Sequence, residues 1–170
     1  MTAINGNLTL LSRNNTMDYP IKVFEIKGFS GERIKLEITD VFGFPNETSF
    51  RGGYDVKCNL EISSGPYSVR TNNYYSSTGA LYNFYDELFK CYNDLNGMAS
   101  YNLDFPENYF DLNVKFDEYG VNISGKYQDD SIIKNILNFE FTSDQSYFKE
   151  VVSDLKKIVL QFGDNQGINK

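Results

Sequence analysis

Adjacent acidic residues are the side chains in this sequence that most resemble catalytic groups. They occur as Asp86-Glu87, Asp117-Glu118 and Asp129-Asp130. Two carboxylates can perform general acid–base chemistry when they face each other across a cleft and burial raises the pKa of one of them. Neighbouring residues on a helix or strand point in different directions, so these pairs are better explained as solvent-exposed charges.

Histidine is absent, which excludes every mechanism that uses imidazole as a base, a proton carrier or a metal ligand. The sequence also lacks the glycine-rich phosphate-binding motifs, the ordered calcium-loop motif and the serine–lysine catalytic motif. Its two cysteines, Cys58 and Cys91, have no metal-ligand spacing, and we expect them to be buried free thiols. The sequence therefore favours binding over catalysis and indicates no catalytic residue, metal or cofactor.

Acidic residues outnumber basic ones by 23 to 16, and the excess is concentrated in one segment. Residues 86–118 contain eight acidic residues and two lysines, so they carry −6 of the chain's net charge of −7. Negative charge disfavours binding to nucleic acid or to an anionic membrane, whereas it suits docking of a basic protein. We expect partner binding by the acidic residues of this segment, namely Asp86, Glu87, Asp94, Asp104, Glu107, Asp111, Asp117 and Glu118.

Tyrosine, asparagine and serine are concentrated in residues 67–85. This combination is typical of adaptable recognition surfaces, so Tyr74 and Tyr75 are further candidates for partner contacts. One alternative is a loop whose tyrosines cover the edge of a sheet. Another is a non-catalytic module that binds a small molecule or a peptide through this tyrosine-rich stretch.

Alternation of apolar and polar residues predicts the β-structure. The longest example, residues 54–62, places five side chains on one face, those of Tyr54, Val56, Cys58, Leu60 and Ile62. Glycines at positions 65 and 120 mark turns that join neighbouring strands. The predicted strands span residues 21–27, 34–39, 54–62, 67–70, 110–116, 121–127 and 135–141.

Two segments change to helical spacing, at about residues 78–96 and 143–162. Gly97 lies just past the first of them. Serine or threonine is available to cap each helix, with Ser77 or Thr78 at the first and Thr142 or Ser143 at the second.

The order strands, helix, strands, helix predicts a single α+β domain over residues 1–170, with antiparallel β-sheet and both amphipathic helices packed on it. The strands before about residue 45 could form either a second layer or a sheet edge. Residues 164–170 are expected to fray. No apolar run approaches the roughly 20 residues of a membrane span, and the start of the chain does not resemble a secretory signal. We expect a cytoplasmic protein that is a monomer or a weak homodimer.

Three segments carry a family resemblance, and they begin Gly53-Tyr54-Asp55-Val56, Ser76-Ser77-Thr78-Gly79 and Leu137-Asn138-Phe139-Glu140. In their order and spacing they resemble the WapI-type immunity proteins over about residues 50–162, whereas residues 1–49 match poorly. The resemblance implies a cytoplasmic antidote to the toxic C-terminal domain of a cell-wall-associated contact-dependent toxin, and such domains typically cleave RNA. The leading hypothesis is therefore stoichiometric neutralisation of a basic toxin domain, a nuclease, through the acidic segment.

Overall fold

The computed structural model describes residues 17–103, 109–129, 132 and 134–168. In the described part, the chain forms two successive sets of four strands, and each set is followed by a helix. The elements are β1 (Ile21–Lys27), β2 (Arg33–Val41), β3 (Asp55–Ser64), β4 (Tyr67–Ser77), α1 (Thr78–Asp94), β5 (Gly97–Leu103), β6 (Tyr109–Asp117), β7 (Gly120–Gln128), β8 (Ile136–Ser143), the 3₁₀ turn η1 (Gln145–Tyr147) and α2 (Phe148–Phe162). This order confirms the predicted α+β class.

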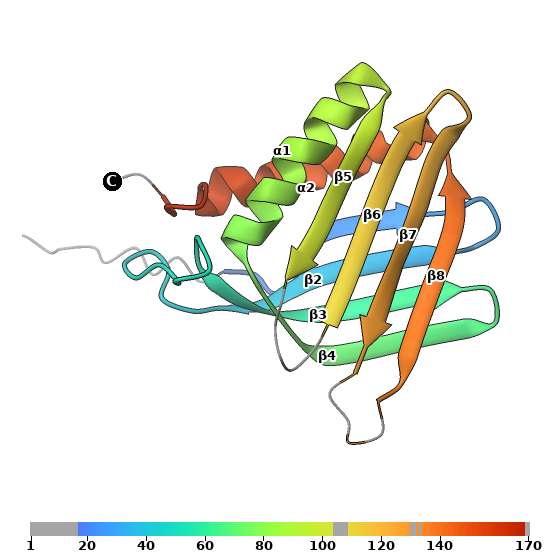
Figure 1. The fold of residues 1–170 in the computed structure, drawn as a ribbon. Coiled ribbons are helices and arrows are strands. Elements are labelled where there is room, and N and C mark those ends of the chain that lie inside the picture. The colour runs from blue at the N-terminus through green and yellow to red at the C-terminus, as the bar shows by residue number, and fades with distance from the viewer. Residues whose placement is uncertain (1–16, 104–108, 130–131, 133, 169–170) are drawn as a thin grey trace, which may run out of the picture.

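The strands form two antiparallel four-stranded sheets, in the orders β1-β2-β3-β4 and β5-β6-β7-β8. The two sheets cross at a steep angle, and both helices lie on the same side of the pair (Figure 1). The earliest strands, β1 and β2, belong to the same sheet as β3 and β4. The sequence left open whether these strands form a second layer or a sheet edge. In the structure they are part of the first sheet, with β1 at its edge.

Each helix packs against the half of the chain to which it does not belong. Helix α1 follows the first sheet but packs along β5, the first strand of the second sheet, and α2 follows the second sheet but packs along β1. The helices also contact each other. Together they cover the side of the molecule where the β1 and β5 edges of the sheets lie (Figure 1).

The core fills the space between the sheets and under the helices. The five residues predicted to share one face of β3 are all buried, which confirms that pattern. Phe84 of α1 touches both sheets, since its ring centroid lies 5.9 Å from that of Phe24 on β1 and 5.7 Å from that of Tyr101 on β5. Helix α1 is therefore part of the contact between the sheets.

A small polar cluster lies inside this apolar core. The hydroxyl of Tyr74 on β4 donates to the hydroxyl of Tyr101 on β5 at 3.0 Å, and the Ser76 hydroxyl also hydrogen-bonds to Tyr101. Burial raises the pKa of both tyrosines and of the nearby Cys58 thiol, so all three groups stay neutral. The cluster therefore links β4 of the first sheet to β5 of the second by hydrogen bonds within the core.

Several predicted boundaries need correction. The first helix is capped by Ser77, as predicted, but it ends at Asp94, and Gly97 starts a strand that the sequence pattern did not reveal. The second helix starts later than predicted. Its expected cap Ser143 ends β8 and donates to the Lys27 carbonyl, while Asp144 caps the 3₁₀ turn that precedes α2.

The tail after α2 is also held in place over its described residues. Gly53 donates its amide to the Asn165 carbonyl at 2.8 Å, the Asn165 side chain donates to Asn83 at 2.9 Å, and the Ile168 amide donates to the Tyr54 hydroxyl at 3.2 Å. Residues 164–168 thus have hydrogen-bond partners just before β3 and on α1, and the expectation that the tail frays stays a prediction.

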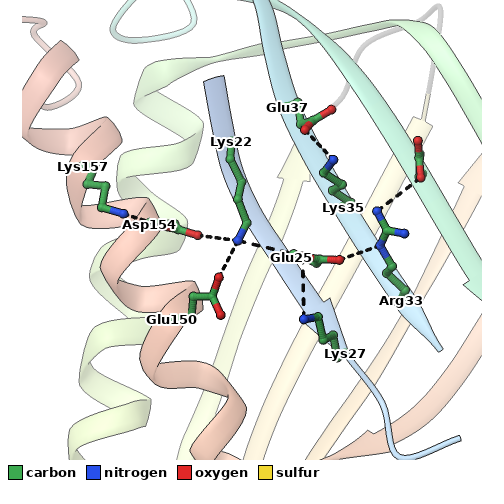
Figure 2. A network of polar contacts seen from close by, with 10 residues as sticks. Lys22, Glu25, Lys27, Arg33, Lys35, Glu37, Glu150, Asp154 and Lys157 are labelled. Atoms are coloured by element: carbon green, nitrogen blue, oxygen red, sulfur yellow. Dashed lines mark hydrogen bonds and ion pairs between the residues drawn. The ribbon is translucent and has the colours of Figure 1, made fainter. Parts of the chain in front are cut away.

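Ion pairs join α2 to β1 on the outer side of the first sheet (Figure 2). Lys22 Nζ of β1 lies 2.6 Å from a Glu150 oxygen and 3.0 Å from Asp154 Oδ2, and Lys157 lies 2.8 Å from the other Asp154 oxygen. The Asp154 side chain is buried. Burial opposes its ionisation, but the cations of Lys157 and Lys22 outweigh that effect and lower the pKa of Asp154.

We expect Asp154→Asn to lower the free energy of unfolding at pH 7 by about 1–2 kcal/mol, since it removes a buried charged acceptor. Because the pKa of Asp154 lies below its ordinary value of 3.8, its stabilisation is present above that value and is lost as the pH falls below it toward the lowered pKa of the folded protein. The difference from wild type should thus shrink as the pH is lowered below about 4 in urea denaturation. Glu150→Gln, at an exposed partner of the same lysine, should have a much smaller effect; an equal effect would contradict this account.

We expect Tyr101→Phe to lower the free energy of unfolding by about 1–3 kcal/mol, because the buried hydroxyls of Tyr74 and Ser76 lose their shared partner. Tyr119→Phe is a matched control, since that tyrosine is 89% exposed. Thermal or urea denaturation measures both. Equal stabilities for the two variants would show that the cluster does not stabilise the fold.

Candidate partner-binding surface

Six of the acidic residues predicted to bind a partner are among the described residues, and they lie on α1, on β6 and in the turn after β6. On α1, Asp86 pairs with Lys90 at 2.6 Å, and both side chains are largely exposed. Glu87 accepts a hydrogen bond from the Ser100 amide of β5 at 2.8 Å. Asp94 is exposed at the end of the helix. We call Asp86, Glu87 and Asp94 the α1 acidic face.

The charges of α1 run against the preference of its helix dipole. Negative charge is stabilising at a helix N-terminus and destabilising at the C-terminus. Helix α1 has no acidic residue in its first turn and no basic residue in its last turn, where Asp94 lies. The pKa of the neighbouring Cys91 thiol is raised, chiefly by burial and then by the charges of Glu87 and Asp94. Asp94 therefore places a negative charge at the end of α1, where the helix dipole does not favour it, while Asp86 and Glu87 lie near the middle of the helix.

The acids of β6 are better compensated. Asp111 accepts a hydrogen bond from the Tyr109 hydroxyl and lies opposite Lys126 in the β6–β7 register. Asp117 lies 3.5 Å from Lys115 and accepts from the Tyr119 amide. Glu118 is exposed in the turn that follows. Lys126 lies outside residues 86–118, so in the folded protein it offsets part of the net charge of −6 that this segment carries.

The strand register shows which of these acids come together. Phe116, next to Asp117, lies opposite Gly97, which follows α1 by three residues. Asp94, Asp117 and Glu118 therefore lie around the same end of the α1–β5 unit, whereas Asp111 lies near the other end of β6. Asp104 and Glu107 lie outside the described residues.

The structure changes the role of the two candidate tyrosines. Both belong to β4, which continues to Ser77 instead of ending at residue 70. Tyr74 is fully buried and donates its hydroxyl to Tyr101, so it is a core residue and not part of a recognition surface. Tyr75 is half-buried and lies opposite Lys57 in the β3–β4 register. Alternation along a strand explains why one tyrosine faces inward and its neighbour outward.

Three tyrosines of the tyrosine-rich stretch, Tyr67, Tyr74 and Tyr85, lie in three different places. A groove of about 490 Å³ lies between the first part of β4 and the β7–β8 end of the second sheet. Of the stretch, it includes residues 67–71, and Tyr67 is the tyrosine among them. Tyr74 is in the core, and Tyr85 stacks on Phe89 of α1. The small-molecule or peptide-binding alternative stays a prediction.

The outer face of the first sheet differs from the α1 acidic face because its charges pair with one another (Figure 2). Arg33 Nε lies 2.7 Å from Glu25, and its guanidinium reaches Glu61 at 3.6 Å. Lys35 pairs with Glu37 in the same way. Such a face satisfies its own charges, so it offers less electrostatic attraction to a partner.

The two thiols of the chain are not activated for nucleophilic attack. Cys58 and Cys91 are free and buried, as predicted, and burial raises the pKa of each thiol. Among the described residues, no group of three or more potential ligands is placed to hold a metal ion. No helix in the described part of the chain is both long and apolar enough to cross a membrane.

The sequence did not indicate a pair of exposed aromatic residues that the structure places in the connection between β2 and β3. The connection between β2 and β3 exposes Phe42 and Phe50 beside two acidic side chains, Glu47 and Asp55. The sequence indicated only turns here, because glycines and a proline interrupt every periodic pattern. An exposed aromatic residue in a turn has no sequence signal of its own, since exposure depends on how the loop folds back.

The family of the chain follows from a comparison with protein-family models. A model described as the immunity protein WapI-like family matches residues 25–163 of the 170. The match begins within β1, so it includes the N-terminal strands that had seemed poorly related. No match is found among curated proteins or among solved structures. Because the family model covers most of the chain, the protein belongs to the immunity protein WapI-like family.

Proposed function

We propose that this protein neutralises a cognate toxin by stoichiometric binding, and that the α1 acidic face is part of the contact. The toxin is a basic domain, and we propose that it is a nuclease acting on RNA. Immunity acts in the cytoplasm in this proposal, where the toxin domain would meet its substrate.

The observation that carries this proposal is the charge distribution on α1. Asp94 lies in the last turn of α1, where a negative charge is unfavourable for the helix, and no base in that turn compensates it. A surface that retains a destabilising charge is typical of a site selected for binding. A basic partner would relieve the repulsion and would be attracted over a distance of about a Debye length.

The neutral, buried nucleophiles support binding over catalysis. Both thiols have raised pKa values, and so do the two tyrosines of the core cluster. A catalytic thiol or phenol needs the opposite shift, toward ionisation near neutral pH. The exposed carboxylates thus remain as groups that can act on a partner by charge alone.

We expect the triple variant Asp86→Asn, Glu87→Gln, Asp94→Asn to associate with the toxin domain encoded beside this protein's gene about tenfold more slowly at low salt. The association rate of wild type should fall steeply with added salt, and that of the variant should fall less. Stopped-flow or surface-based kinetics measures both. Glu140→Gln, at an exposed acid of β8, is the control and should behave as wild type. Association insensitive to salt would contradict an acidic contact.

We expect Asp94→Asn alone to change stability and binding in opposite directions. Removing the charge from the last turn of α1 should raise the free energy of unfolding by about 0.3–1 kcal/mol. The same change should weaken inhibition of the toxin, because it removes part of the contact. Urea denaturation and titration of the toxin's nuclease activity test the two effects. A variant that gains stability and inhibits as well as wild type would remove Asp94 from the interface.

A further inference from the structure

The connection between β2 and β3 is held rigidly by backbone hydrogen bonds. The Phe42 amide donates to the Asp55 carbonyl at 2.9 Å, and the Ser49 amide donates to the Gly53 carbonyl at 2.7 Å. Gly53 in turn donates to the Asn165 carbonyl of the C-terminal tail at 2.8 Å. The connection is therefore tied both to the sheet and to the end of the chain.

Aromatic contacts anchor the inner side of the same connection. The ring of Phe44 meets those of Tyr54 and Phe162 edge to face, with centroids 5.1 and 5.2 Å apart. The Tyr54 hydroxyl donates to the Pro45 carbonyl at 3.2 Å. These contacts preorganise the outer side chains, so a partner would not have to order the loop on binding.

The outer side exposes two large apolar rings. Phe50 is 91% exposed and Phe42 is 48% exposed, although full burial of such a side chain is worth about 1.5–3 kcal/mol. Both line one surface hollow of about 430 Å³. Because the loop is rigid, the rings are presented together, and a partner could bury both.

The hollow also has negative charge in its lining, from Glu47 and Asp55. Asp55 accepts from the Ser49 hydroxyl at 2.8 Å and lies 3.4 Å from Arg51. Glu47 is exposed, and no ion pair of its side chain occurs within the described residues. The guanidinium of Arg51 lies 4.6 Å from the centre of the Phe50 ring, so this ring already carries one cation on its face.

The hollow lies next to the start of α1. The Gly79 amide of α1 donates to the Gly52 carbonyl at 3.2 Å, and the Ser77 hydroxyl donates to the Arg51 carbonyl at 3.5 Å. The loop between β2 and β3 reaches the same end of the molecule as the start of α1 and the C-terminal tail (Figure 1). A partner that covers the length of α1, about 24 Å, could therefore contact both the α1 acidic face and the hollow at the start of the helix.

We propose that the hollow between Phe42 and Phe50 receives a lysine or arginine side chain of the toxin domain. The methylene stem of that side chain packs between the rings, and its cation pairs with Glu47. The inference rests on the proposed function, because it names a second contact for the same partner. It adds an apolar anchor, which slows dissociation, to an acidic face that speeds association.

The test uses the full chain and the toxin domain encoded beside its gene. Phe50→Ala and Glu47→Gln should each raise the Kd at least about tenfold, mainly through faster dissociation. Their effects should be less than additive in the double variant, because both residues contact one side chain of the toxin. Phe29→Ala is the matched control, since Phe29 is 61% exposed in the β1–β2 turn at the opposite end of β2, and it should leave the Kd unchanged.

The outcomes separate the two proposals. If wild type does not bind the toxin domain, the proposed function fails and this inference fails with it. If wild type binds and Phe50→Ala changes the Kd less than twofold, only the hollow is excluded. Additive effects of Phe50→Ala and Glu47→Gln would show that the two residues do not contact the same side chain of the toxin. Equal urea midpoints for wild type and Phe50→Ala establish that a loss of affinity is not a loss of folding.

Discussion

The structure depends on mutual coverage of two sheets that each have one apolar face. Neither face can stay in water, and together they bury one continuous core. Crossed sheets separate toward one side, and α1 and α2 fill that side (Figure 1). Phe84 joins the parts, because its ring touches β1 of the first sheet and β5 of the second. As a result, each helix covers the first strand of the other half of the chain, so that α1 lies on β5 and α2 lies on β1.

Because the inner faces of both sheets are buried in the core, only the outer surfaces are available to contact a partner. On the first sheet, the charges satisfy one another and tie β1 to α2 (Figure 2). On α1, Asp94 is set against the helix dipole, whereas Asp86 and Glu87 lie near the cation of Lys90. The rigid loop with Phe50 adds an apolar element beside the same helix. A charged surface with a small apolar anchor at one end is the composition expected of a fast and tight protein interface.

Elements with strong periodicity were predictable from sequence, and weakly patterned ones were not. β3 and α2 follow the expected spacing closely, whereas β5 was missed. Its sequence Gly97–Leu103 contains glycine, serine and asparagine, which have low strand propensity, and it forms because it pairs with β6 and packs under α1. The second part of β4 was missed because its adjacent pairs Asn72-Asn73 and Tyr74-Tyr75 break the alternation of apolar and polar residues. Tyr74 consequently was assigned to a surface, although it lies in the core.

The sequence by itself determined the α+β class, the amphipathic faces, the buried free cysteines and the acidic segment, because each depends on residue type and local spacing. It also carried enough of the family pattern to indicate an immunity protein. Tertiary structure decided which acids stay uncompensated, since Asp111 lies opposite Lys126 of another strand whereas Asp94 has no such neighbour in the described chain. It likewise decided which aromatic rings are exposed. Charge pairing and exposure depend on residues distant in sequence, and only the folded chain brings them together.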